Sequence, residues 1–270
     1  MKQICVITGG GSGMGLATAH IMGKDNYIIL VGRTASKLSD AVKELQKDGI
    51  KAEAFSADIG NEESAKKLAT YAASKGNVTS LIHAAGLSPH MGDGETIARV
   101  NALGTIYLDN AFYEVMNEGS CIINVSSMSA YIAPQFIIPK KAFRFALTDV
   151  DKFFTKIMKR INLMPKSQHS NIAYIVSKSF VIWYSKAIAN KMGEKGIRIL
   201  SVTPGNFETP MGKLEEKEAS AYVERSAIKR FGKPEEIASL LAFCASPKPG
   251  FLTGTDIICD GGCIAGGMKK

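Results

Sequence analysis

The amino-acid sequence predicts an α/β domain built on a parallel sheet. Short apolar runs alternate with longer segments of helical periodicity, which is the pattern of repeated strand–helix units. The first run, residues 4–7, is apolar at every position, as a strand covered by helices on both faces requires. A glycine-rich stretch, residues 8–15, follows it directly. Together these observations predict a ligand-binding turn at the start of the sheet.

Composition sets broad limits on the protein. The 270 residues are 46% hydrophobic and 21% charged, and we expect residues 1–270 to form a single domain. With no run of eighteen apolar residues and no signal-peptide pattern, a cytoplasmic protein without a membrane partner is expected. The five cysteines form no Cys-x-x-Cys pair, which argues against a disulfide framework or a metal site.

The turn after the first strand is the first candidate binding site. It leads into a helix expected over residues 16–23. Glycines let backbone N–H groups approach a pyrophosphate, and a helix N-terminus favours an anion. The context predicts a dinucleotide site, the alternative being a tight turn with no ligand. The candidate residues are Gly9, Gly11, Ser12, Gly13, Met14 and Gly15.

The end of the second strand, residues 27–31, indicates which dinucleotide binds. Folds that select NAD carry an acidic residue here for the ribose 2′-hydroxyl, whereas this chain has Gly32 and Arg33. Because a guanidinium suits a 2′-phosphate, we predict NADP(H) as the preferred cofactor, with NAD(H) as the alternative. A merely solvated Arg33 is the other interpretation.

The next two strands end in further polar candidates. A helix over 37–47, a strand over 51–57 and a helix over 62–75 precede a strand over 80–84. Asp58 is placed either to bind an adenine amino group or to serve in helix capping. His83 ends the later strand, has no second metal-type ligand near it in sequence, and is interpreted as structural.

A long helix and a fifth strand add two candidates. The helix, residues 96–116, carries Asn101 in its interior, where asparagine is disfavoured unless its side chain makes a specific hydrogen bond. The strand starts at Cys121 and ends in Ser127, at the edge where open α/β sheets bind ligands. Ser127 is either a ligand contact or a simple turn residue.

Residues 131–170 interrupt the alternation. This segment contains eight Lys or Arg residues and two Asp residues, so six of the chain's eight net positive charges lie here. We interpret these cations as a solvated helix face rather than a nucleic-acid site, because exposed aromatics do not accompany them. An apolar stripe at helical spacing must be covered by the parent domain or by a second subunit. It consists of Val150, Phe153, Phe154, Ile157, Met158 and Ile161.

Tyr174 and Lys178 follow the insertion, on a helical pattern that continues through Trp183. Residues four apart share one face of a helix, so both side chains project into the same cleft. A cation beside a tyrosine stabilises the phenolate, which a proton-transferring tyrosine needs. A strand over 196–202, an irregular stretch to residue 231, a helix from residue 233 and a last strand over 256–259 complete the chain.

Eight of these motifs occur in an order that resembles the short-chain dehydrogenase/reductase family. They are the turn of residues 8–15, Asp58, Ala-Ala-Gly86, Asn101, Ser127, Tyr174-x-x-x-Lys178, Pro204-Gly205 and Asp260-Gly-Gly262, and they span residues 3–263. The resemblance implies a Rossmann-type, doubly wound, seven-stranded parallel sheet with a helical insertion between the catalytic Ser and Tyr. It also implies a homodimer or homotetramer, and an insertion lobe over about 131–170 that reshapes the interface and borders the substrate pocket.

The resemblance assigns roles to single residues. Tyr174 would be the general acid in ketone reduction and the base in alcohol oxidation, with Lys178 lowering its pKa and holding the nicotinamide ribose. Ser127 would orient the carbonyl, and Asn101 would anchor a proton-relay water. Further cofactor contacts are implied for Ile59, Ala85, Gly86, Tyr174, Lys178, Pro204, Gly205 and Thr209.

Two departures from the family pattern matter. His83 replaces the usual asparagine before Ala-Ala-Gly86, which puts that structural hydrogen bond in doubt. Ser127 lies 47 residues before Tyr174, where members usually have about a dozen. A long insertion here resembles the bacterial 3α-hydroxysteroid dehydrogenase/carbonyl reductase branch, although that branch usually takes NAD. The enoyl-reductase variant is disfavoured, because its tyrosine and lysine usually stand further apart.

The leading hypothesis is an NADP(H)-dependent oxidoreductase that interconverts a ketone and a secondary alcohol. Its substrate would be a bulky apolar molecule such as a hydroxysteroid or ketosteroid. A 3-oxoacyl-thioester reductase is the alternative among enzymes. The alternative of another class is a non-catalytic dinucleotide-binding sensor or scaffold, against which the complete catalytic set argues.

Overall fold

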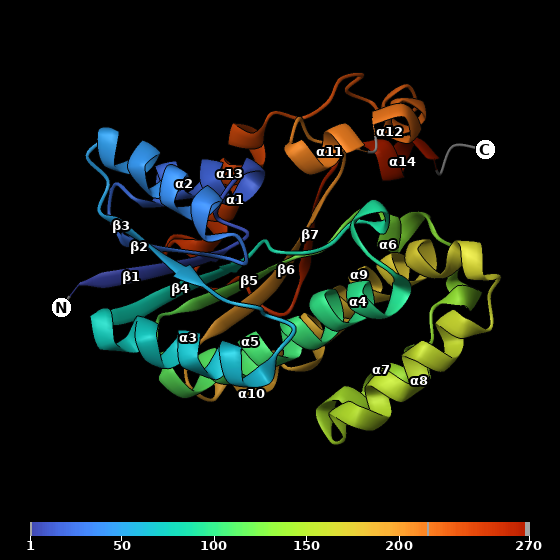
Figure 1. Ribbon diagram of the computed structural model, residues 1–270, viewed down its shortest axis with the longest axis horizontal. Coiled ribbons are helices and arrows are strands. Elements are labelled where there is room, and N and C mark those ends of the chain that lie inside the picture. The colour runs from blue at the N-terminus through green and yellow to red at the C-terminus, as the bar shows by residue number, and fades with distance from the viewer. Residues whose placement is uncertain (1, 215, 268–270) are drawn as a thin grey trace.

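The computed structural model describes residues 2–214 and 216–267 and contains one seven-stranded sheet, in which all neighbouring strands are parallel (Figure 1). The strand order is β3-β2-β1-β4-β5-β6-β7, which confirms the predicted doubly wound fold. The strands are β1 (Gln3–Thr8), β2 (Tyr27–Gly32), β3 (Ala52–Ser56), β4 (Asn77–His83), β5 (Cys121–Val125), β6 (Arg198–Pro204) and β7 (Asp256–Cys259).

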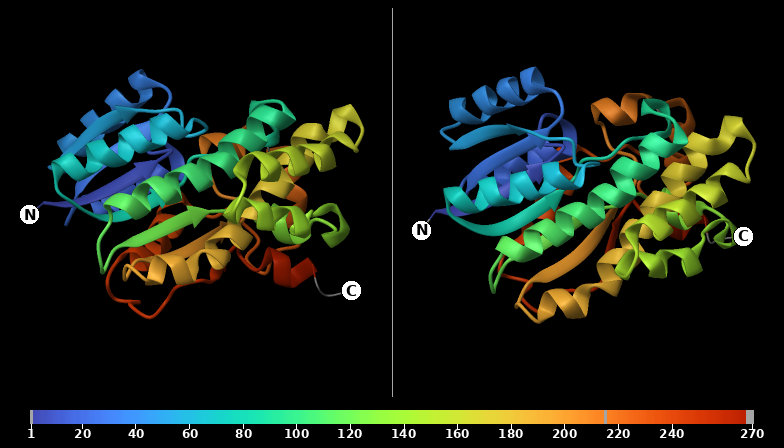
Figure 2. Two further views of the ribbon diagram at one scale, coloured as in Figure 1. Left: turned by 90° about the horizontal axis from the view of Figure 1, so that it is seen from below. Right: turned by 60° about the horizontal axis from the view of Figure 1, so that its bottom comes forward.

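Helices cover the sheet on both faces (Figures 1 and 2). One face packs against α1 (Gly13–Met22), α2 (Ala35–Lys47) and α13 (Pro234–Ala245). The other packs against α3 (Glu62–Lys75), α4 (Gly94–Ala98), the π-helical turn η2 (Arg99–Leu103), α5 (Gly104–Val115), α9 (His169–Ala187) and α10 (Ala189–Gly193). This double coverage is why the central strands β1 and β5 are buried at nearly every position. No helix in the described ranges combines the length and apolarity needed to cross a membrane.

The sheet has a topological switch point between β1 and β4. From β1 the chain winds outward to β2 and β3, then returns to β4 on the other side of β1. Ligands bind at such a point, beyond the carboxyl ends of the strands. There Thr8 and His83 lie side by side in register, and the turns that follow them approach closely. Gly9 has a φ of +69°, and a Cβ on it would lie 2.9 Å from the backbone of Ala84.

The stretch between β6 and α13, predicted to be irregular, contains α11 (Pro210–Leu214) and α12 (Glu216–Val223). Its two ends meet in a bridge between Phe207 and Gly232. Outside it lie the short elements η1 (Pro89–Met91) and α14 (Cys263–Gly267).

The segment 131–170 folds into short helices around one longer helix. It begins within α6 (Ser129–Ile132) and continues through η3 (Gln135–Ile137), α7 (Lys140–Phe143), η4 (Arg144–Leu147), α8 (Val150–Asn162) and η5 (Lys166–Gln168). Figure 1 shows α7 and α8 on the outer side of α4 and α9. Asp149 caps α8 by accepting a hydrogen bond from the backbone N–H of Lys152 at 2.9 Å.

The apolar stripe of α8 is covered by the same chain. Phe153, Ile157 and Ile161 are fully buried in the core that contains α9. Phe153 packs on Phe180 of α9, with ring centroids 4.4 Å apart. The other three stripe residues, Val150, Phe154 and Met158, are partly buried against the same core. The parent domain therefore supplies the predicted partner surface for most of the stripe. The homodimer or homotetramer stays a prediction.

A buried carboxyl group joins three elements beneath the ligand edge. Asp109 of α5 is fully buried, and its Oδ2 accepts a hydrogen bond from Asn124 Nδ2 of β5 at 2.8 Å. The same nitrogen donates to Ser185 Oγ of α9 at 3.1 Å. Burial raises the pKa of Asp109 to about 8, since one amide donor does not compensate for lost hydration. Asp109 is therefore a neutral acid at pH 7.

Phe153→Ala should lower the free energy of unfolding by roughly 3–5 kcal/mol, because it opens a cavity between α8 and α9. Lys156→Ala on the exposed face of the same helix should change it by less than about 0.5 kcal/mol. Urea unfolding of both variants measures the difference. Equal, small effects would show that α8 is not part of the core.

Asp109 should make the protein less stable as pH rises from about 4 to about 8. In the unfolded chain this group titrates near its model value of 3.8, whereas in the folded protein it keeps its proton until about pH 8. The folded state binds more protons across this window, so its advantage is lost as pH rises. Urea unfolding across the window should show a stability that changes with pH by about one proton more favourably in Asp109→Asn than in the wild type, while the exposed-site control Asp151→Asn keeps the wild-type slope. An unchanged slope in Asp109→Asn would contradict the assignment.

Candidate active site

Two adjoining pockets form a crevice at the carboxyl ends of the strands. The smaller has a volume of about 270 Å³ and is lined by the glycine-rich turn and the ends of β2, β3 and β4. The larger has a volume of about 590 Å³ and is lined by Ser127, Tyr174 and Lys178. Gly86, Leu87 and Thr209 line both. Every site residue predicted from the sequence lines one of these pockets, except Asn101.

The glycine-rich turn delivers the N-terminus of α1 to the smaller pocket. The helix starts at Gly13, inside the turn rather than at the predicted residue 16, so its first amides border the pocket. Gly13 has a φ of +54°, and a Cβ on it would lie 3.3 Å from Thr209 Cβ. The backbone N–H groups at the start of the helix are therefore accessible to a diphosphate in this pocket.

Arg33 and Asp58 line the far end of the smaller pocket. Thr34 and Lys37, which sequence reasoning missed, line it too and place the start of α2 beside Arg33. The sequence did contain a signal for Lys37, because this lysine stands four residues after Arg33, in the first turn of the helix. Asp58 Oδ1 accepts a hydrogen bond from Gly60 N, whereas Asn61 caps α3. Asp58 therefore shapes a turn and is not the helix cap.

Tyr174 and Lys178 lie one turn apart on α9 and both line the larger pocket. Lys178 Nζ is 6.0 Å from the centre of the Tyr174 ring and donates a hydrogen bond to Val125 O at 2.9 Å. Burial lowers the pKa of Lys178 to about 8, because a buried ammonium loses hydration. A Cβ on Gly86 would lie 3.2 Å from this nitrogen, so Lys178 reaches the junction of the two pockets.

Ser126 and Ser127 have different environments. Ser126 is buried, and its hydroxyl donates to Lys178 O at 2.8 Å, which ties the end of β5 to α9. Ser127 is partly exposed, lines the larger pocket, and its Oγ accepts a long hydrogen bond of 3.3 Å from Ser129 N. The hydroxyl proton of Ser127 is therefore the one free to face a ligand.

Asn101 lies behind the pocket wall, in the π-helical turn that joins α4 and α5. Its amide accepts from Leu87 N at 2.8 Å and donates to Leu87 O at 2.9 Å. It also donates to Ser177 Oγ at 3.3 Å. The expected specific hydrogen bond exists, and it fixes the loop after β4 at Leu87. The relay-water role stays a prediction.

His83 makes a hydrogen bond that joins the ends of β4 and β1. Its Nδ1 lies 2.8 Å from Thr8 Oγ1, which in turn accepts from Ala85 N at 3.1 Å. Burial, and then the charge of Lys178, lower the pKa of His83 to about 3. A neutral imidazole therefore joins the ends of β1 and β4 without adding charge to the site. This agrees with the structural interpretation of His83.

The remaining walls of the larger pocket come from distant segments. The insertion contributes residues 132–134 and Gln168, so it borders the pocket as expected. The stretch between β6 and α13 contributes Phe207, Tyr222 and Phe231. Among the described residues, Lys178 is the one Lys, Arg, Asp or Glu side chain that lines this pocket. Sequence reasoning missed these walls, because no spacing in the chain links loops so far apart.

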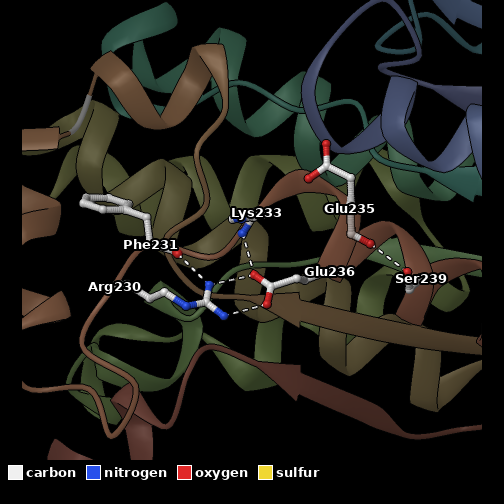
Figure 3. Close-up of polar contacts among 6 residues, drawn as sticks. All are labelled: Arg230, Phe231, Lys233, Glu235, Glu236 and Ser239. Carbon is white, nitrogen blue, oxygen red and sulfur yellow. Dashed lines mark hydrogen bonds and ion pairs between the residues drawn. The ribbon is translucent and has the colours of Figure 1, made fainter.

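An ion pair, shown in Figure 3, holds the pocket wall that the stretch between β6 and α13 contributes. Arg230 donates from Nη1 and Nη2 to the two carboxylate oxygens of Glu236, at 2.8 and 2.6 Å. Glu236 also accepts from Lys233 N at 2.7 Å, and Arg230 Nη1 donates to Phe231 O at 3.0 Å. The first turn of α13 therefore fixes the backbone that presents Phe231 to the pocket.

Comparison with known proteins identifies the fold's family. Residues 3–148 match the family described as short chain dehydrogenase. The chain belongs to the short-chain dehydrogenase/reductase family. Residues 159–263 match a further family description, enoyl-(acyl carrier protein) reductase, so the part between the two matches falls within the insertion.

Members of the short-chain dehydrogenase/reductase family resemble this chain over nearly its whole length. Short-chain dehydrogenase/reductase bsc3 of Alternaria brassicicola is 28% identical over 98% of this chain and 97% of its own. The 3-oxoacyl-[acyl-carrier-protein] reductase FabG of Thermotoga maritima is 25% identical over 97% and 98%. A short chain dehydrogenase of Burkholderia cenocepacia, solved in complex with NADP, has a TM-score of 0.77 at 23% identity and covers 96% of both chains.

Proposed function

We propose that the protein is an NADP(H)-dependent oxidoreductase that interconverts a bulky apolar ketone and its secondary alcohol. One observation carries this proposal: Ser127, Tyr174 and Lys178 converge on a pocket whose other walls hold no charged Lys, Arg, Asp or Glu side chain among the described residues. Such a pocket suits a neutral carbonyl compound with an apolar body. Membership of this oxidoreductase family supports the reaction class.

The residues divide the chemistry between them. Tyr174 gives its phenolic proton to the substrate oxygen during reduction and takes it back during oxidation. Lys178, desolvated and one turn away, stabilises the phenolate that this transfer leaves. Ser127 donates a hydrogen bond to the same oxygen and fixes its direction. Asn101 keeps the loop after β4 in place at Leu87 and, as proposed, anchors a proton-relay water.

The smaller pocket fits a nicotinamide dinucleotide. Residues 9–15 would hold its diphosphate, Asp58 and Ile59 would contact adenine, and Ala85, Gly86 and Thr209 would border the nicotinamide half. When bound, this cofactor supplies the hydride. Arg33, Thr34 and Lys37 surround the place of a 2′-phosphate, and their two cations support a preference for NADP(H) over NAD(H).

Other assignments find less support. A 3-oxoacyl-thioester reductase remains the alternative among enzymes, since the relative FabG carries that name at 25% identity. The four-residue spacing of Tyr174 and Lys178 favours carbonyl over enoyl reduction. A sensor or scaffold would not need Ser127, Tyr174 and Lys178 together in one pocket. The insertion supports the hydroxysteroid dehydrogenase/carbonyl reductase branch. We also propose one domain over residues 1–270 and a homo-oligomer.

Tyr174→Phe should lower kcat by about 10²- to 10⁴-fold while leaving NADPH affinity nearly unchanged, because only the proton donor is lost. Steady-state reduction of a panel of cyclic and fused-ring ketones, together with NADPH fluorescence titration, measures both quantities. Ser126→Ala and Ser127→Ala form a matched pair, of which Ser127→Ala should lose more turnover. A loss of only a few-fold in Tyr174→Phe would refute the role of the tyrosine.

Arg33→Asp should weaken NADP(H) binding by roughly ten- to a hundred-fold and improve NAD(H) binding, because a charge-assisted contact to the 2′-phosphate becomes repulsive. Lys37→Ala should weaken NADP(H) less, since one of the two cations remains. Titration of both cofactors against the wild type and each variant decides the preference. A wild type that binds NAD(H) more tightly than NADP(H) would overturn the argument.

A further inference from the structure

One wall of the larger pocket is the first part of the insertion. Residues 132–134 line the pocket at the end of α6, a helix of four residues. A single helical turn is not stable by itself, because its nucleation cost is not recovered within one turn. Contacts outside α6 must therefore determine where this wall lies.

The first such contact belongs to Tyr131, which does not line the pocket. Its hydroxyl donates a hydrogen bond to Asp256 Oδ2 of β7 at 2.7 Å. The Asp256 carboxylate also accepts hydrogen bonds from the hydroxyls of Ser201 and Thr203 on the neighbouring strand β6, which fix its position. Burial and the neighbouring carboxylate raise the pKa of Tyr131 well above its ordinary value, which keeps the phenol a donor.

A second contact holds the far side of the same wall. The Arg160 guanidinium of α8 donates to the carbonyl oxygens of Phe136 and Ile137, at 2.6 and 3.1 Å. Residues 132–134 therefore span the gap between an anchor on the sheet and an anchor on α8. The start of α6 is also tied to the sheet by the hydrogen bond from Met128 N to Pro204 O, at 3.0 Å. Loss of the Tyr131 contact would therefore loosen the wall, rather than detach it, relative to Ser127 and the catalytic residues on α9.

We propose that Tyr131 and Asp256 form a positioning pair that fixes the insertion-side wall of the pocket and so determines how well large ketones are accepted. The inference rests on the proposed function. A hydrogen bond to a charged carboxylate is stronger than one between neutral groups. Removing the bond between Tyr131 and Asp256 would therefore destabilise the observed position of residues 132–134. A large substrate touches this wall, whereas a compact one needs only Ser127 and Tyr174.

Tyr131→Phe tests the pair, because it keeps the ring and removes the hydroxyl. Tyr107→Phe is the matched control, since Tyr107 of α5 packs against the core and lines neither pocket. With NADPH, kcat/KM for a fused-ring ketone such as 2-decalone should fall about ten-fold in Tyr131→Phe, and that for butanone should stay within about two-fold. An equal loss for both ketones, or no loss for either, would overturn the specificity role.

Hydrogen exchange gives a readout that does not depend on activity. In Tyr131→Phe the amides of residues 128–137 should exchange about ten-fold faster than in the wild type, and those of Tyr107→Phe should not change there. Unchanged exchange in Tyr131→Phe would refute the anchor itself. If the wild type reduces neither ketone, the proposed function fails, and the exchange result still decides whether the pair holds the wall.

Discussion

Burial of the sheet on both faces is the constraint from which the rest of the structure follows. Helices occupy both faces, so the strands can present polar groups to a ligand only at their carboxyl ends. Thr8, His83 and Ser127 all stand at that edge, on three different strands or just beyond them. The chain leaves β1 in one direction along the sheet and β4 in the other, which opens a crevice beyond these two strands. The turns that follow β1 and β4 are in close contact at Gly9 and Ala84.

The insertion enlarges this site without disturbing the sheet. Its cations other than Arg160 are exposed, while its apolar stripe enters the core beside α9, the helix that carries Tyr174 and Lys178. Both ends of the insertion return to the pocket, because one follows β5 and the other precedes α9. A lobe attached in this way can alter the substrate wall while leaving Ser127, Tyr174 and Lys178 in place.

Sequence patterns predicted what local spacing determines. Glycine content, strand periodicity and the four-residue separation of Tyr174 and Lys178 predicted the sheet, the cofactor turn and the catalytic pair, but not the outer walls of the larger pocket. The pairing of Tyr131 with Asp256 could not be predicted from the sequence, because the two residues are 125 positions apart and neither belongs to a motif. The π-helical turn at Asn101 was also missed; it coincides with the hydrogen bonds of the Asn101 amide to Leu87, a tertiary contact.

The environment of Lys178 explains why histidine can stand at position 83. The buried ammonium is already costly, and a second positive charge nearby would add repulsion in a medium that screens it poorly. Burial keeps the imidazole neutral, so it makes the hydrogen bond to Thr8 Oγ1 without that repulsion. At this edge of the sheet the neutral ring of His83 therefore joins β1 to β4. The ammonium of Lys178 is the charged group beside Tyr174.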